Sequence, residues 1–255
     1  MVNRRSAWLW GFIIPALLLL AWQVVCQTQL APPSILPAPS LVLATLKSMA
    51  ASGEMAQAVG ATATRLLWGF FFGALAGTLL GALCGASALV RNLADPLVQA
   101  LRSVPSLAWV PLLILWLGIF ESSKITLIAI GVFFPVYLNL MSGIANVDRK
   151  LIEVGRVHGY SRLARLLRIQ LPAALPAYVT GLRGGLGLGW MFVAAAELLG
   201  ATNGLGFILD DGEQTGRPER VIAAILLFGL CGKITDSFMA EAAKRLVAWQ
   251  DTVRN

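Results

Sequence analysis

The sequence predicts an all-α protein, a polytopic bundle of membrane-spanning helices. Of its 255 residues, 57% are hydrophobic and only 13% are charged, whereas soluble domains carry about 25% charged residues. The apolar residues form stretches of roughly twenty, the length that an α-helix needs to cross about 30 Å of hydrocarbon. These stretches and their short connections leave no room for a second folded domain of about 100 residues. We therefore expect one domain over residues 1–255.

Six stretches are long enough to span a membrane. The first follows Arg4 and Arg5, as a signal peptide would, but it is long for one and has no small-residue cleavage site before Cys26. We therefore expect it to be retained as the first span. The six predicted spans are 7–25, 66–90, 101–120, 125–144, 182–201 and 221–239.

The positive charges predict which ends of the spans face the cytoplasm. The net charge is +7, without an aromatic–basic motif for nucleic acid. Lys and Arg number 14 on one set of alternate loops and 5 on the other, the smaller set being Lys47, Arg65, Lys124, Arg217 and Arg220. By the positive-inside rule, both termini and the loop between the fourth and fifth spans are cytoplasmic.

Glycines recur every fourth residue in the second predicted span. This spacing places them on one helical face, where missing side chains let a neighbouring helix approach closely. We expect a helix-packing role for Gly69, Gly73, Gly77, Gly81 and Gly85. The chain has no GxxxxGK[ST] sequence, so it cannot hydrolyse ATP through a P-loop.

Ionisable residues and prolines within the spans suggest a translocation path. Glu197 and Lys233 lie in apolar stretches, and an ionisable group at membrane depth is by default a functional-site hypothesis. Alternatively, Glu197 reaches the outer interface or pairs with a cation of another helix. Prolines kink spans, and kinked helices line paths or serve packing alone. The candidate path residues are Trp109, Pro111, Pro135, Trp190 and Glu197.

The cytoplasmic loop 148–176 predicts two short helices. Asp148 can cap a first helix that ends at Gly159, and Ser161 can cap a second that ends before Pro172. A helix of this kind lies on lipid headgroups or docks in a partner's groove. In the second helix, three leucines share one face and three arginines the opposite face: Leu163, Leu166 and Leu167 against Arg162, Arg165 and Arg168.

In the same loop, Gly159 follows Glu153 by six positions, and Ile169, Leu171 and Pro172 follow in turn. This spacing resembles the "EAA" signature, EAA-x3-G-x9-I-x-L-P, of the membrane subunits of bacterial ABC importers. Val154 and Gly155 stand where that signature has two alanines. In the family, the loop forms a coupling helix that seats in a cleft of a separate ATPase subunit. The resemblance therefore implies an ATPase-coupling role for Glu153, Val154, Gly155, Gly159, Ser161, Arg162, Ile169, Leu171 and Pro172.

Other segments are similar to one branch of that family, the permeases for sulfonates, taurine, nitrate and related small anions. They are Pro37 to Val42, Arg102 to Pro105, Pro111 to Gly118, and the sequence WMFVAAAELLGATNGLG over 190–206. The resemblance covers about residues 35–245. It implies a permease that forms the path for a small anionic solute, delivered by a periplasmic binding protein.

The resemblance also implies partners and a location. We expect a homodimer of two permease copies with two ATP-binding subunits and a periplasmic solute-binding protein, in the bacterial inner membrane. No cofactor, metal site or catalytic residue is expected in this chain, because ATP and Mg²⁺ would bind the partner subunit. The alternatives are a stand-alone channel or ion-coupled carrier and, more remotely, a membrane-embedded enzyme. The sequence shows neither the coupling-ion ligands and repeats of a carrier nor the polar constellation of an enzyme.

Overall fold

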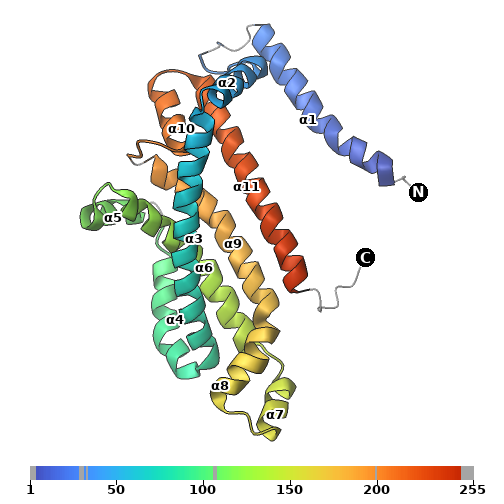
Figure 1. Cartoon of the computed structure of the whole chain (residues 1–255), viewed down its shortest axis with the longest axis vertical. Coiled ribbons are helices and arrows are strands. Elements are labelled where there is room, and N and C mark those ends of the chain that lie inside the picture. Colours follow the sequence, from blue (N-terminus) through green and yellow to red (C-terminus); the bar gives the residue numbers. More distant parts are fainter. Residues whose placement is uncertain (1–3, 29–31, 33, 106–107, 199, 248–255) are drawn as a thin grey trace. The chain divides into compact units, whose positions relative to one another are not determined.

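The computed structural model describes residues 4–28, 32, 34–105, 108–198 and 200–247, with side chains from residue 13 onward. Over these residues the secondary structure is helical, without strands, which confirms the predicted all-α class. The elements (Figure 1) are α1 (Arg4–Gln27), α2 (Pro39–Ala51), α3 (Glu54–Ala86), α4 (Ala88–Arg102), α5 (Trp109–Leu117), α6 (Glu121–Ala145), α7 (Arg149–Val157), α8 (Arg162–Arg165), the π-helix η2 (Leu166–Gln170), α9 (Leu171–Glu197), α10 (Leu205–Gln214) and α11 (Pro218–Leu246).

Four helices in the described part of the chain are long and apolar enough to cross a membrane. They are α3, α6, the continuous helical segment Arg162–Glu197 and α11, and Ile13–Gln27 within α1 is a shorter apolar helix. The polytopic helical bundle is thus confirmed, whereas the count of six spans is not. Every predicted span except 101–120 falls largely on one of these helices.

The described residues of 101–120 do not form one continuous helix, which corrects the predicted third span. Here α4 ends at Arg102 and α5 has only nine residues, about 14 Å of helix. Pro105 removes a backbone donor and disfavours helical geometry at Val104. Pro111 is tolerated in the first turn of α5, where its missing N–H costs nothing. Ser106 and Leu107 lie outside the described residues.

The chain divides into two compact units. The terminal unit comprises Met1–Ala61 and Ala201–Phe228, and the central unit comprises Thr62–Gly200 and Gly229–Asn255. In the terminal unit, α2, α10 and the adjoining parts of α3 and α11 share an apolar core of Val42, Met49, Ala58, Leu205, Ile208, Ala223, Ala224 and Leu227. The arginine Arg220 pairs there with Glu54 and with Asp211.

In the central unit, glycine-bearing faces of α3 and α9 both pack against α6. A Cβ atom added at Gly77 of α3 would lie 2.8 Å from the Phe133 carbonyl oxygen and 3.0 Å from the Val136 Cβ of α6. On α9, a Cβ atom added at Gly185 would lie 3.2 Å from the carbonyl oxygen of Val132 in α6. Val132 also lies next to Gly73 of α3. The glycines therefore bring both neighbouring helices close to α6, where dispersion contacts hold membrane helices together.

Candidate functional site

Helix α7, the first helix of the EAA-type loop, begins and ends where the sequence predicts. The Asp148 side chain accepts a hydrogen bond of 2.8 Å from the backbone N–H of Lys150. At the other end, Gly159 has a φ of +72°, the left-handed conformation that favours glycine. The N–H of Tyr160 then donates to the Gly155 carbonyl at 3.0 Å, and that of Gly159 donates to the Arg156 carbonyl at 2.9 Å. This is a Schellman motif, which stops the helix.

Gly155, one of the two departures from the family signature, lies where α7 packs on η2. It is buried, and a Cβ atom added there would lie 2.5 Å from the Cδ1 of Ile169 and 3.2 Å from the Cγ of Arg165. Glycine at this position therefore permits a closer approach of the two segments than alanine would. Glu153, the signature's acidic residue, accepts a hydrogen bond of 3.1 Å from Nε of Arg149.

The second helix of the loop begins as predicted but does not end before Pro172. The Ser161 side chain caps it by accepting from the N–H of Ala164 at 3.2 Å. The helix then passes through η2, where the N–H of Leu171 donates to the carbonyl of Leu166, and continues as α9. The wider π-turn accommodates the proline ring, which would clash with a carbonyl in a regular α-helix. The predicted end before Pro172 is therefore wrong, and α8 is the start of the long helix that includes α9.

The leucines predicted to share a face of this second helix differ in burial. Leu166 packs against the buried cluster of Leu140, Ile144 and Ala174, whereas Leu163 and Leu167 are exposed. On the basic side, Nη1 of Arg165 donates to the Tyr160 carbonyl at 2.8 Å. The Arg168 guanidinium lies 5.5 Å from the centre of the Tyr160 ring.

Helix α7 presents an apolar face without a covering element in the described chain. Leu151, Val154 and Val157 follow one another at three-residue spacing, and 47%, 53% and 86% of their surfaces are exposed. Residues at this spacing are neighbours on a helix. A group of exposed apolar residues marks an interaction site in many proteins. We name this set the α7 apolar face.

A buried ion network joins α3, α6 and α9 in the central unit. Arg65 donates from Nη1 to Glu197 at 2.7 Å, from Nε to one oxygen of Glu121 at 2.6 Å and from Nη2 to the other at 2.9 Å. The hydroxyl of Thr62 donates to Glu197 at 2.9 Å. Both Glu197 and Arg65 are buried. The alternative in which Glu197 pairs with a cation of another helix is therefore the arrangement observed.

Sequence reasoning missed Arg65 as the partner of Glu197. It assigned Arg65 to the outer loop before the second span, whereas α3 begins at Glu54 and contains Arg65. The signal that could have found the pair is charge matching, because a buried carboxylate requires a compensating cation.

A groove of about 500 Å³ lies between the end of α4, α5, α6 and α9. Its lining includes Arg102, Trp109, Pro135, Asn139 and Phe192. Two of the five predicted path residues, Trp109 and Pro135, therefore meet at this groove.

The other three predicted path residues lie elsewhere. Pro111 is exposed on α5, and Nε1 of Trp190 donates to the hydroxyl of Thr235 on α11 at 2.8 Å. Glu197 belongs to the ion network. Lys233, the other intramembrane candidate, is exposed on α11.

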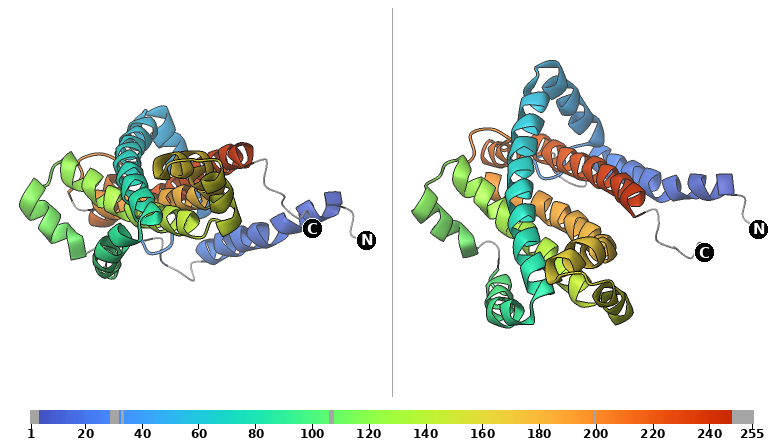
Figure 2. Two further views of the ribbon diagram at one scale, coloured as in Figure 1. Left: turned by 90° about the horizontal axis from the view of Figure 1, so that it is seen from below. Right: turned by 60° about the horizontal axis from the view of Figure 1, so that its bottom comes forward.

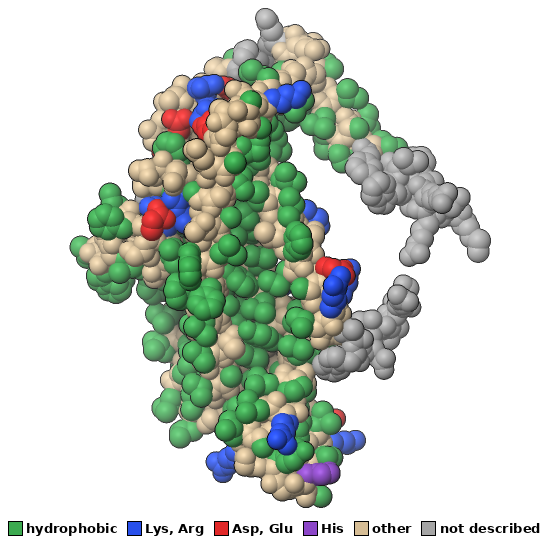
Figure 3. All heavy atoms as spheres, in the orientation of Figure 1, with side chains coloured by type: hydrophobic (Ala, Val, Ile, Leu, Met, Phe, Trp, Pro, Cys, Tyr) green, Lys and Arg blue, Asp and Glu red, His purple; other side chains and the backbone are tan. Residues whose placement is uncertain are grey.

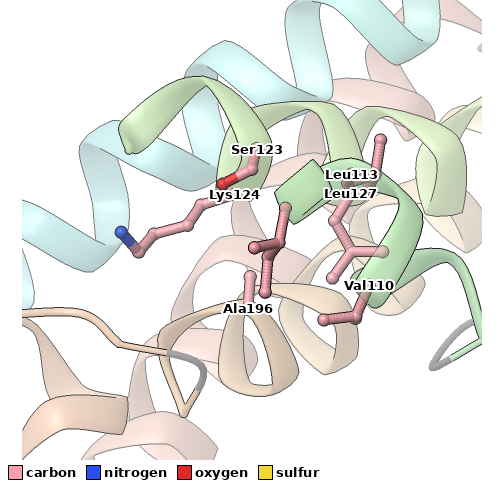
Figure 4. A pocket seen from close by; sticks show the side chains of 7 residues that line it. Val110, Leu113, Ser123, Lys124, Leu127 and Ala196 are labelled. Carbon is pink, nitrogen blue, oxygen red and sulfur yellow. The ribbon is translucent and has the colours of Figure 1, made fainter. Parts of the chain in front are cut away.

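A smaller cavity of about 10 Å³ lies beside Lys124 (Figure 4). Val110, Leu113, Leu127 and Ala196 line it, and the Lys124 side chain extends away from them. Its Nζ donates to the Ile119 carbonyl at 3.1 Å. The cavity has room for about one water molecule, so it cannot hold a transported solute.

Among the residues the structure describes, His, Cys, Asp and Glu form no group of three or more that could hold a metal ion.

The sequence over 77–247 matches the profile of the family described as binding-protein-dependent transport system inner membrane component. The chain belongs to this family. It is 39% identical over 250 residues to SsuC of Bacillus subtilis, a permease protein assigned to aliphatic sulfonates transport, covering 98% of this chain and 91% of SsuC. It is 34% identical over 265 residues to the taurine transport system permease protein TauC of Escherichia coli, covering 99% of this chain and 96% of TauC.

The fold is similar to a solved structure of the MetNI methionine ABC transporter in an inward-facing conformation. The TM-score is 0.59 at 21% sequence identity, over 71% of this chain and 92% of the matched chain. The predicted resemblance to importer permeases of the sulfonate and taurine branch is thus confirmed.

Family membership fixes the general role of the chain. It is a permease component of an ABC importer in the inner membrane, with several membrane-crossing helices. Permease components are not enzymes, and ATP is hydrolysed by a separate subunit. Such a permease works with an ATPase and a substrate-binding partner.

Proposed function

We propose that two copies of this chain, each folded as one domain over 1–255, form the path for a small anionic solute of the sulfonate, taurine or nitrate type. In this proposal, the EAA-type loop of each copy docks on an ATPase subunit. The observation that carries the docking is the α7 apolar face, an exposed apolar surface that another protein can cover. Both termini and this loop are cytoplasmic, as the distribution of Lys and Arg supports.

The coupling step follows from the continuity of the loop with α9. The α7 apolar face seats in a cleft of the ATPase subunit, in the manner of a helix in a groove. Gly155 holds α7 against η2, and η2 runs without interruption into α9. Because α9 packs closely on α6, movement of the loop reaches the helices that line the groove. ATP-driven closure would thereby rock the permease between inward- and outward-facing states.

The groove suits a small anion with an apolar part. The guanidinium of Arg102 offers paired donors for a sulfonate or other oxyanion. Trp109 and Phe192 offer aromatic surface beside it, and Asn139 offers an amide. The names of the relatives point to the same class of solute. The binding protein selects the solute, so the groove needs only weak recognition of its own.

The coupling proposal is tested by co-purification of the tagged chain with its partner ATPase subunit. Val154→Asp places a charge in the α7 apolar face, and we expect at least a tenfold loss of bound ATPase. Val154→Leu keeps the position apolar and serves as the matched control, with wild-type recovery expected. ATPase assays in nanodiscs should also show stimulation by the loaded binding protein for wild type and the control.

Two results would contradict the proposal. If Val154→Asp retains the ATPase at wild-type level, the α7 apolar face is not the docking surface. If the wild-type chain purifies without an ATPase in every mild detergent, a stand-alone channel or carrier becomes the better-supported hypothesis.

A further inference from the structure

The central unit contains a cavity lined by arginines that has no part in the proposed ATPase docking. Its volume is about 580 Å³, and it lies between the EAA-type loop and the junction of α3 with α4. Figures 1 and 2 both place α7 and α8 beside the end of α3 at which α4 begins. Three arginines line the cavity, Arg156 from α7 and Arg162 and Arg165 from α8, together with Ser87 and Gln170.

These three arginines are not neutralised within the described chain. No carboxylate is among the described residues that line the cavity, and no described Asp or Glu forms an ion pair with any of the three. The carboxylate of Glu153, one turn away, pairs with Arg149 instead. Three guanidinium groups around one cavity repel one another unless an anion lies between them.

Two further contacts prepare the cavity for an anion. Arg165 is held in place by its hydrogen bond to the Tyr160 carbonyl. Helix α4 begins at Ala88, which also lines the cavity, after the capping residue Ser87. The positive end of a 15-residue helix therefore lies at the cavity, where it adds to the attraction for a phosphate.

The surface that leads to the cavity is apolar. Leu75, Leu79 and Leu83 follow one another at four-residue spacing along α3 and are all exposed. This face ends within one turn of Ala86, which lines the cavity. Since α3 is one of the candidate membrane spans, the leucines offer a track for an acyl chain. In Figure 3, hydrophobic side chains cover most of the face shown along α3 and α4, and Lys and Arg side chains lie at the end that carries α7 and α8.

The geometry points to a binding site for the headgroup of an anionic phospholipid, with its phosphate among Arg156, Arg162 and Arg165 and an acyl chain along α3. The site lies on the opposite side of α7 from the α7 apolar face. At 100° per residue, Ile152 and Arg156, which line the cavity, lie about 180° from the centre of that face. Lipid and ATPase therefore bind α7 from different sides.

The test measures lipid retained by the full-length chain, in whatever complex it purifies, by native mass spectrometry during titration with phosphatidylglycerol or phosphatidylcholine. We expect phosphatidylglycerol to be retained in preference. Arg156→Gln with Arg162→Gln should weaken its binding about thirtyfold, since each basic residue near a charged lipid contributes about a factor of five. Arg149→Gln with Lys150→Gln removes the same charge from residues outside the cavity and should change the affinity less than about twofold.

A variant that keeps every charge guards against simple loss of folding. Ala88→Leu adds bulk at the cavity wall and should also weaken binding of phosphatidylglycerol, while thermal unfolding of the three variants stays near that of wild type. Equal loss of lipid in the Arg149/Lys150 control, or equal retention of phosphatidylcholine by wild type, would overturn the proposal.

Free phosphate is separated from lipid by competition. If inorganic phosphate displaces phosphatidylglycerol at equimolar concentration, the site recognises phosphate itself and the lipid assignment is wrong. We expect lipid to remain bound at a hundredfold excess of inorganic phosphate, because the acyl chain adds apolar contact. The readout is lipid mass alone, so its outcome is independent of ATPase docking and of transport.

Discussion

The helices α3, α6 and α9 and the coupling segment 148–170 belong to the same unit, but they differ in whether their glycines, charges and apolar side chains have partners within the described chain. In the three helices, the glycines pack against α6, and the buried charge of Glu197 meets Arg65. In the coupling segment, Val154 and Val157 are exposed. Side chains and glycine faces that pack or pair within the chain stabilise the fold. Apolar side chains that remain exposed indicate a binding partner outside the chain.

The largest expected effect comes from breaking the ion network. Glu197→Leu leaves Arg65 buried with one carboxylate fewer, and removal of one member of a buried pair costs about 3 kcal/mol. We expect the free energy of unfolding to fall by about this amount, measured by titration with dodecyl sulfate in mixed micelles.

The matched control breaks an exposed ion pair of the same unit. In Asp236→Asn, the bidentate pair with Arg183, at 2.6 and 2.9 Å, is lost at a site open to its surroundings. The loss of stability should be much smaller, because exposed pairs are screened. If Glu197→Leu has the same free energy of unfolding as wild type but no longer supports uptake, Glu197 belongs to the path rather than to the structural network.

An intermediate effect is expected at the glycine face of α3. Gly77→Val forces side-chain atoms against the backbone of α6 at Phe133, and overpacking of this kind costs about 2 kcal/mol. Gly229→Val on α11 is the control, because a Cβ atom there would meet nothing within 4 Å. Equal stability of the two variants in the same titration would show that α3 and α6 are not tightly packed.

The smallest effect on stability, with the largest effect on function, is expected at Gly159. Gly159→Val places a β-branched residue at a φ of +72°, which costs about 1 kcal/mol. The variant should remain inserted, and the ATPase subunit bound to it should still hydrolyse ATP. Uptake of solute should be lost, because the turn between α7 and α8 is distorted. Uptake and hydrolysis are measured together in proteoliposomes.

Gly159→Asn is the control, since asparagine tolerates the left-handed conformation better than valine. It should retain most of the uptake. Normal uptake by Gly159→Val would count against a coupling role for this loop and would weaken the contrast between the two regions.

Several local features follow from the sequence because they depend on neighbours in the chain. The caps of Asp148 and Ser161, the turn at Gly159 and most of the long apolar helices lie where expected. The break in 101–120 follows from Pro105, which disfavours helical geometry at the residue before it, but the apolar run of this segment predicts one continuous span. The passage through Pro172 also escaped prediction, because a π-turn absorbs the proline without ending the helix.

Composition, span length and the EAA-type spacing are all properties of the linear chain, and together they suffice to predict a helical membrane protein of the importer-permease type. The folded chain adds that Glu197 pairs with Arg65, that Trp109 and Pro135 line one groove, and that three arginines line one cavity. These groupings join residues far apart in sequence. They depend on how helices pack against one another, and the packing is set by contacts that no local pattern specifies.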